Sequence, residues 1–155
     1  MEQDKVIPGF LNDTLGFNLA RVANLFRLEL IRALTNYDLT PEQYQIMVLV
    51  WYGPESLNQQ DITQLLSKDK HNISRMVRRL EAKGWLERRP DPHSRAFFVR
   101  PTELGQRLKD EVPRALYAHF ETLNLGLSET QEQEIVTLLK VVRAHLSDDQ
   151  VRINP

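Results

Sequence analysis

Cationic and hydrogen-bonding side chains recur at helical spacing between residues 69 and 83. On a helix drawn at about 100° per residue, His71, Arg75 and Arg78 fall on one side, with Ser74 and Arg79 beside them. Arginine, serine and histidine suit the acceptor-rich base edges of the DNA major groove, which admits a single helix. This face therefore has the chemistry of a surface that reads double-stranded DNA. An amphipathic surface helix that carries arginine for solubility is the alternative.

The other side of this segment is apolar and should hold it against a core. Four residues lie within about 100° of one another on the same helical wheel: Ile73, Met76, Val77 and Leu80. Asp69 is a good N-cap, and Gly84 stands where a C-terminal cap is expected. We therefore predict a recognition helix from Asp69 to Lys83.

Positive charge is concentrated in the segment from Lys68 to Arg100. This segment holds ten Lys and Arg residues against four Asp and Glu residues, a balance of +6, whereas the remainder holds ten basic and seventeen acidic residues, a balance of −7. Such asymmetry is what electrostatic docking onto phosphates requires. A solvated charged face would give the same counts.

Helical periodicity extends to both sides of this segment. Five further helices are predicted from apolar spacing and capping residues: Asp13 to Thr35, Thr40 to about Val50, Asn58 to about Leu66, Thr102 to about Leu123 and Ser128 to Leu146. Pro41 and Gln43 strengthen the start of the second of these helices. A break at Ser67-Lys68 precedes the recognition helix, and Pro113 should bend the helix that contains it.

After the recognition helix, the pattern changes to that of a β-hairpin. One strand contains Arg88 and Arg89, the turn-rich run from Pro90 to Ser94 forms the tip, and the second strand runs from Ala96 to Val99. Arg95, beside the tip, suits the narrow minor groove, where negative potential is focused. Arg88 and Arg89 are placed for phosphates, which fix register without reading sequence.

The predicted order is four helices, a hairpin and two helices. Three helices followed by a hairpin are the parts of a winged helix-turn-helix lobe. We therefore predict a mainly α fold with a small β-hairpin wing. The lobe covers residues 38–101, and helices within 10–37 and 102–147 complete a single unit of residues 1–155.

Composition excludes several other classes of protein. The 155 residues contain no cysteine, which rules out disulfides, thiolate zinc sites, a thiol nucleophile and cysteine-based redox sensing. The longest apolar run, Ile46 to Tyr52, is too short to span a membrane, and Trp51 and Tyr52 at its end are expected in the core. The first ten residues lack the pattern of a signal peptide, so we expect a cytoplasmic protein without membrane partners.

No pattern of catalytic residues accompanies these features. We find no phosphate-cradling glycine loop, nucleophile elbow, H-E-x-x-H motif or paired-carboxylate site, and therefore expect no enzyme activity. The four histidines are scattered along the chain, and His119 and His145 are interpreted as ordinary helix residues. We expect neither a metal nor a cofactor.

The chain resembles the multiple-antibiotic-resistance regulator (MarR) family from about Leu15 to Leu146. Three segments carry the likeness: NISRMVRRLEAKGWLERRPDP (Asn72 to Pro92), RAFFVRPTELG (Arg95 to Gly105) and LTPEQYQIMVLV (Leu39 to Val50). The family's usual wing, DP-x-D-R-R-A, is one residue shorter here and reads DPHSRA from Asp91 to Ala96. Arg95 matches the second arginine of that wing.

The resemblance implies a homodimer in which three helices interlock across a two-fold axis: Asp13 to Thr35, Glu103 to Leu123 and Gln131 to Leu146. It implies a repressor that binds a pseudo-palindromic operator and is released by a small aromatic or anionic effector. The alternatives are an activator, an effector-blind regulator, or a winged-helix protein–protein module. No residue identifies an effector site. The residues assigned to DNA contact are Lys70, His71, Asn72, Ser74, Arg75, Arg78, Arg79, Arg88, Arg89, His93, Ser94 and Arg95.

Overall fold

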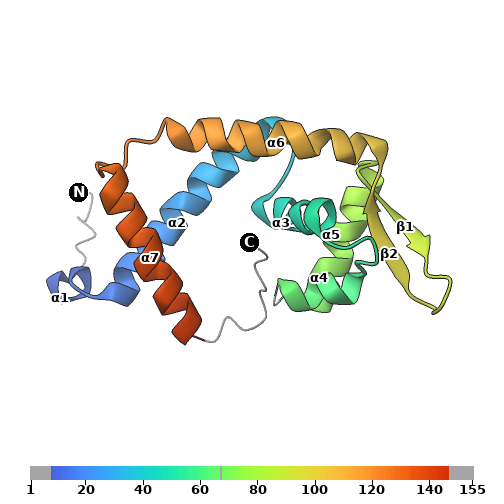
Figure 1. Cartoon of the computed structure of the whole chain (residues 1–155), viewed down its shortest axis with the longest axis horizontal. Helices are drawn as coiled ribbons and strands as arrows, with labels where there is room; N and C mark the ends of the chain where they lie inside the picture. Colours follow the sequence, from blue (N-terminus) through green and yellow to red (C-terminus); the bar gives the residue numbers. More distant parts are fainter. Residues whose placement is uncertain (1–7, 67, 147–155) are drawn as a thin grey trace, which may run out of the picture. The chain divides into compact units, whose positions relative to one another are not determined.

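A computed structural model describes residues 8–66 and 68–146, which form seven α-helices, one 3₁₀ turn and a two-stranded sheet (Figure 1). The mainly helical fold with a hairpin wing is therefore confirmed. The chain divides into two compact units between Pro41 and Glu42. The boundaries of the predicted lobe remain a prediction. Ser67, residue 147 and the ends of the predicted 1–155 unit lie outside the described residues.

The first unit contains three helical segments: α1 (Gly9–Asn12), α2 (Leu15–Leu34) and a 3₁₀ turn (Thr35–Tyr37). The long helix begins at Leu15, two residues after the approximate start near Asp13 that the sequence predicts. Thr14 has an extended backbone, with ψ of 136°, and its hydroxyl donates to the carbonyl oxygen of Leu11 at 2.8 Å. The large apolar side chains that α2 leaves exposed are Leu15, Val22, Leu25, Phe26, Leu28 and Ile31.

The second unit begins at the second residue of α3 and holds the elements of the predicted lobe: α3 (Pro41–Tyr52), α4 (Gln59–Leu65), α5 (Lys70–Ala82), β1 (Leu86–Pro90) and β2 (Phe97–Pro101). The two strands are antiparallel, with Leu86 opposite Pro101 and Pro90 opposite Phe97. The hairpin is confirmed. Its predicted tip began one residue early, because Pro90 pairs within the ladder and belongs to β1.

The hairpin is joined to the segment that precedes α4. The amide of Val99 donates to the carbonyl oxygen of Leu57 at 2.8 Å, and Asn58 forms an antiparallel bridge with Phe98. This connection was not predicted, because so short a segment is not long enough to show an alternating pattern. It fixes the base of the wing against the start of α4.

The flanking residues set the ends of α5, as predicted. The carboxylate of Asp69 accepts hydrogen bonds from two first-turn amides at 2.9 and 3.1 Å. Gly84 has a φ of +72°, and its amide donates to the carbonyl oxygen of Glu81 at 2.8 Å, which closes the helix with a left-handed residue. The helix predicted from Asp69 to Lys83, counted with its two caps, is confirmed. Its role as a recognition helix stays a prediction.

Apolar residues from α3, α4, α5 and the hairpin form the core of this unit. Its fully buried side chains include Ile46, Met47, Leu57, Ile62, Ile73, Val77, Leu80 and Val99. Met76, predicted to face the core, is only half-buried. Trp51 is buried as predicted, but the core position predicted for Tyr52 is wrong, because its side chain is 64% exposed. Tyr52 ends α3, and the ammonium of Lys109 lies 4.5 Å from the centroid of its ring.

Two further helices follow the wing: α6 (Glu103–Glu121) and α7 (Glu129–His145). The predicted caps are confirmed, since Thr102 accepts from the amide of Gly105 at 3.0 Å and Ser128 forms a capping box with Gln131. Pro113 lies inside α6, and the predicted bend there stays a prediction. No residue of α7 is buried, and its exposed large apolar side chains are Ile135, Val136, Leu138, Leu139 and Val141.

Candidate nucleic-acid interface

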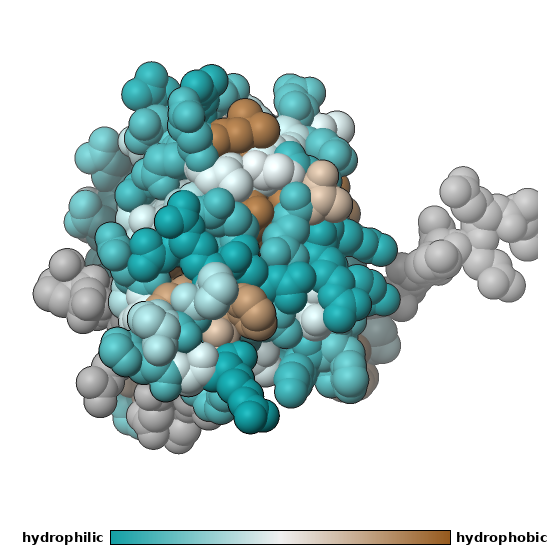
Figure 2. All heavy atoms as spheres, turned by 90° about the vertical axis from the view of Figure 1, so that its right-hand side faces the viewer, coloured by the Kyte–Doolittle hydropathy of each residue, from teal (hydrophilic) through white to brown (hydrophobic). Residues whose placement is uncertain are grey.

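The side chains predicted to contact DNA lie on the outer side of α5. Ile73, Val77 and Leu80 are fully buried, so the opposite side of the helix faces solvent. Ser74 is half-buried, and the exposed residues are Lys70, His71, Asn72, Arg75, Arg78 and Arg79. Figure 2 shows the side of the molecule that carries the hairpin, where hydrophilic residues predominate and apolar residues form only small patches. This face is suited to contact with a hydrated, charged partner.

Two of these residues are joined by a hydrogen bond. An Nη of Arg75 donates to Oδ1 of Asn72 at 2.7 Å. Residues three apart are neighbours on a helix surface, so this contact needs no distortion of α5. The sequence predicted that both residues contact DNA, but it did not predict that one would hold the other.

Each of the two arginines of β1 forms a salt bridge with a glutamate. Nε of Arg88 donates to Oε1 of Glu81 at 2.7 Å, and Nε of Arg89 donates to Oε1 of Glu87 at 2.6 Å. The hydrogen bond to Glu81 raises the pKa of the Arg88 guanidinium above its ordinary value. Both arginines remain exposed. Any phosphate contact by either one would therefore compete with a carboxylate, which the sequence pattern did not reveal.

Asp91 and Ser94 organise the tip of the wing. The carboxylate of Asp91 accepts from the hydroxyl of Ser94 at 2.6 Å and from the amide of His93 at 2.8 Å. These two hydrogen bonds, that from Ser94 first, lower the pKa of Asp91 below its ordinary value. The hydroxyl oxygen of Ser94 also accepts from the amide of Ala96 at 3.1 Å. Ser94 thus shapes the turn that presents the exposed side chains of His93 and Arg95.

Thr102 connects the end of α5, the base of the wing and α6. Its hydroxyl donates to the carbonyl oxygen of Gly84 at 2.5 Å, and its amide donates to the carbonyl oxygen of Trp85 at 3.0 Å. The backbone of Gly105 lies so close to that of Trp85 that a Cβ at position 105 would be 1.9 Å from the Trp85 carbonyl oxygen. The sequence indicated only the capping role of Thr102. The additional contacts set the position of the wing relative to α5.

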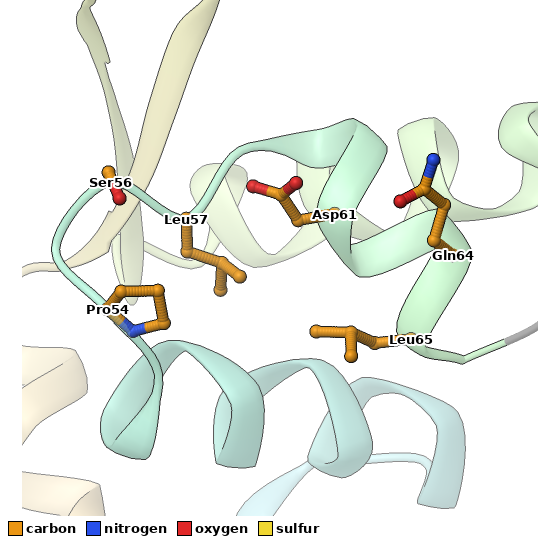
Figure 3. A pocket seen from close by; sticks show the side chains of 6 residues that line it. All are labelled: Pro54, Ser56, Leu57, Asp61, Gln64 and Leu65. Carbon is orange, nitrogen blue, oxygen red and sulfur yellow. The ribbon is translucent and has the colours of Figure 1, made fainter. Parts of the chain in front are cut away.

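A hollow of about 710 Å³ lies beside α4 (Figure 3). Its lining residues are Pro54, Ser56, Leu57, Asp61, Gln64 and Leu65. Asp61 already serves the start of α4, because its carboxylate accepts from the amide of Asn58 at 2.9 Å. No cationic side chain lines the hollow, so the lining supplies no counter-charge for an anionic ligand.

The described part of the chain comprises residues 8–66 and 68–146. That part of the chain has no group of three or more His, Cys, Asp or Glu side chains that could hold a metal ion. None of its helices is long and apolar enough to cross a membrane. His119 and His145 make local contacts, with the ring of Phe120 and with the carbonyl oxygen of Val141 respectively.

Comparisons with known proteins agree with this geometry. The sequence profile described as the MarR family matches residues 37–96, which run from before α3 to the wing. The HTH-type transcriptional regulator BilQ of Clostridioides difficile (strain CD3) is 26% identical over 84% of this chain and 88% of its own length. A solved MarR-family transcriptional regulator from Rhodococcus sp. RHA1 is 27% identical, with a TM-score of 0.76 over 85% of this chain and 94% of that chain.

Two solved structures of CouR show the same fold. CouR from Rhodococcus jostii RHA1 bound to p-coumaroyl-CoA has a TM-score of 0.74 and 24% identity, and covers 92% of this chain and 98% of that chain. The transcriptional repressor CouR bound to a 23-mer DNA duplex has a TM-score of 0.80 and 21% identity, over 89% of this chain and 98% of that chain. Together these matches confirm the resemblance stated from the sequence.

Proposed function

We propose that the chain is a DNA-binding transcription regulator of the MarR family: a homodimeric repressor of a pseudo-palindromic operator, released by a small-molecule effector. The observation that carries this proposal is the exposed basic row on α5, held from behind by buried apolar residues and followed directly by the wing. A helix of this kind fits the major groove, and a hairpin placed after it reaches the neighbouring backbone or minor groove.

The proposed roles differ along the interface. His71, Ser74, Arg75 and Arg78 face base edges from α5, and Lys70 and Arg79 flank them. Arg95 enters the minor groove, where arginine is attracted by the focused negative potential. Arg88 and Arg89 contact phosphates, together with His93 and Ser94 at the tip.

The homodimer is supported by helix surfaces that are otherwise unexplained. No residue of α7 is buried, although five of its large apolar side chains lie on its surface. Exposed large apolar side chains gathered on one helix indicate an interaction site. By resemblance to the family, we propose that a second copy of the chain covers it. In such a dimer the two lobes would address successive half-sites of the operator.

Release by an effector rests on the likeness to CouR, whose structure with p-coumaroyl-CoA shows that a protein of this fold takes an anionic aromatic ligand. We propose an effector of that broad class. We also propose that the protein acts in the cytoplasm and by binding alone, without catalysis, as expected of transcription regulators such as BilQ.

Selection of binding sites from random duplexes by the purified full-length protein tests the proposal. We expect two inverted half-sites about 10 base pairs apart, and an affinity that falls steeply with salt because phosphate contacts release counterions. The variant with Arg75 and Arg78 both changed to Ala should lose the preference. The proposal fails if the wild-type protein prefers no sequence at physiological salt.

Gel shifts of the selected duplex with aromatic acids and their thioesters then test release. Loss of the shift with one ligand class would identify the signal. A complex that no ligand dissociates would contradict release by this class and favour an effector-blind regulator. If the Arg75 and Arg78 changes instead left binding to a protein partner intact and the chain never bound DNA, the protein–protein module would be the correct alternative.

A further inference from the structure

Asn72 occupies an exposed position on α5, one turn before Arg75, and its side chain is already engaged. Its Oδ1 accepts the hydrogen bond from Arg75 at 2.7 Å. Its backbone is held as well, because its amide donates to the carboxylate of Asp69 at 3.1 Å. The short side chain of Asn72, on a backbone that is itself hydrogen-bonded to Asp69, therefore holds the longer side chain of Arg75.

This contact changes the base that Asn72 would be expected to read. An asparagine that reads adenine in the major groove accepts from N6 and donates to N7, and so needs its carbonyl oxygen for the base. Here one of the two lone pairs of that oxygen is already occupied by Arg75. The donors that remain on the pair outnumber its acceptors: they are the N–H groups of the Asn72 amide nitrogen and of the Arg75 guanidinium, against one remaining lone pair on Oδ1.

A pair in which donors predominate matches guanine, whose major-groove edge presents the acceptors O6 and N7. It matches adenine less well, because the N6 amino group of adenine is itself a donor. We infer that Asn72 is a positioning residue that holds Arg75 for a guanine and does not itself read adenine. This inference rests on the proposed function, in which α5 enters the major groove.

Preorganisation is the physical effect expected from such a contact. A free arginine side chain loses rotamer freedom when it binds, whereas one already held in its bound direction loses less. This smaller entropy loss increases affinity only for a base that can accept hydrogen bonds from Arg75 in the orientation in which Asn72 holds it. Asn72 should therefore affect discrimination between bases more than it affects binding to DNA in general.

The test measures dissociation constants of the full-length protein for its selected duplex and for duplexes in which single G·C pairs are replaced by A·T. Arg75→Ala first identifies the base pair that Arg75 reads. Asn72→Ala should then reduce discrimination at that same pair by about 2- to 10-fold, the effect of one hydrogen bond. Affinity for random duplex should fall by less than this factor. In the Arg75→Ala background, Asn72→Ala should have no further effect at that pair.

Asn72→Asp provides the rescue. Its carboxylate can still accept from Arg75, so the preference for guanine should persist while the added negative charge weakens binding to every sequence. Thermal unfolding of each variant checks the fold, and an exposed Asn→Ala change within a helix should not lower stability.

Two results would overturn the inference while leaving the proposed function intact. One is sequence-specific binding in which Asn72→Ala leaves discrimination at the Arg75 base pair unchanged. The other is loss of an adenine preference at a different base pair, which would make Asn72 a direct reader. Absence of any sequence preference in the wild-type protein would contradict the proposed function instead.

Discussion

The indole Nε1–H of Trp51 donates to the carbonyl oxygen of Gly105 at 2.9 Å. This buried contact joins the last turn of α3 to the first turn of α6. A second bond, from Nζ of Lys109 to the carbonyl oxygen of Trp51 at 3.0 Å, joins the same two helices. These two hydrogen bonds thus hold α6, the helix that follows the wing, against α3, which belongs to the core beneath α5.

Trp51→Phe should lower the free energy of unfolding by about 1–3 kcal/mol, because it leaves the buried Gly105 carbonyl without its side-chain donor and shrinks a buried ring. Urea denaturation monitored by circular dichroism measures the change. Tyr52→Phe is the control, since Tyr52 is the adjacent aromatic residue and its side chain is 64% exposed. Equal stability of the two variants would show that the Trp51 contact contributes nothing.

Gly105→Ala should be destabilising by about 1–3 kcal/mol, because the new Cβ would have to displace backbone from a packed site. The nearest obstacle is the Trp85 carbonyl oxygen, 1.9 Å from that Cβ, so the shift should also disturb the base of the wing. Gly16→Ala is the matched control, because a Cβ there meets nothing within 4 Å. A stability equal to that of the control would contradict the close approach.

The wing tip should lose its order only in strong acid. The pKa of Asp91 is lowered from its ordinary value of 3.8, chiefly by the Ser94 hydroxyl. A lowered pKa means that the contribution of the ionised carboxylate is fully present above the unfolded-state value and is lost as the pH falls through the lower folded value. An NMR titration of the His93 and Ala96 amides should show this midpoint below 3.8.

Ser94→Ala removes the first cause of that shift, so the midpoint should move up towards the ordinary value. The same variant should bind DNA more weakly if the ordered tip presents Arg95 to the minor groove. An unchanged midpoint in Ser94→Ala would show that the hydroxyl contact is absent in solution.

Glu81→Gln should strengthen binding to every DNA sequence by a few fold, roughly the effect of one surface charge pair. Glu81 accepts from Arg88 at 2.7 Å, so the neutral amide frees the arginine charge for phosphate. The slope of log affinity against log salt should steepen at the same time. Glu111→Gln, on the exposed side of α6, removes the same charge away from the recognition helix and hairpin. If both changes act equally, Arg88 has no phosphate contact.

The local elements of this lobe were predictable because their signals lie within a few residues of one another. In α5, apolar residues recur at helical spacing between the N-cap Asp69 and the C-terminal Gly84. Asn58, Thr102 and Ser128 are likewise N-caps that mark the starts of their helices. Failures occurred where a local pattern was ambiguous. Tyr52 ends an apolar run in the sequence, yet its side chain is exposed. The spacing of apolar residues alone does not show which end of such a run leaves the core.

By itself, then, the sequence determined which segments become helices or strands and which side of α5 is basic, because hydrogen bonding and burial within one element follow a fixed period. The tertiary structure decided which charges have partners. Glu81 and Arg88 are seven residues apart and belong to a helix and a strand, so only the turn at Gly84 brings them together. The same holds for Thr102 with Gly84, and for Trp51 with Gly105, because side-chain partners from different elements are set by chain folding in space.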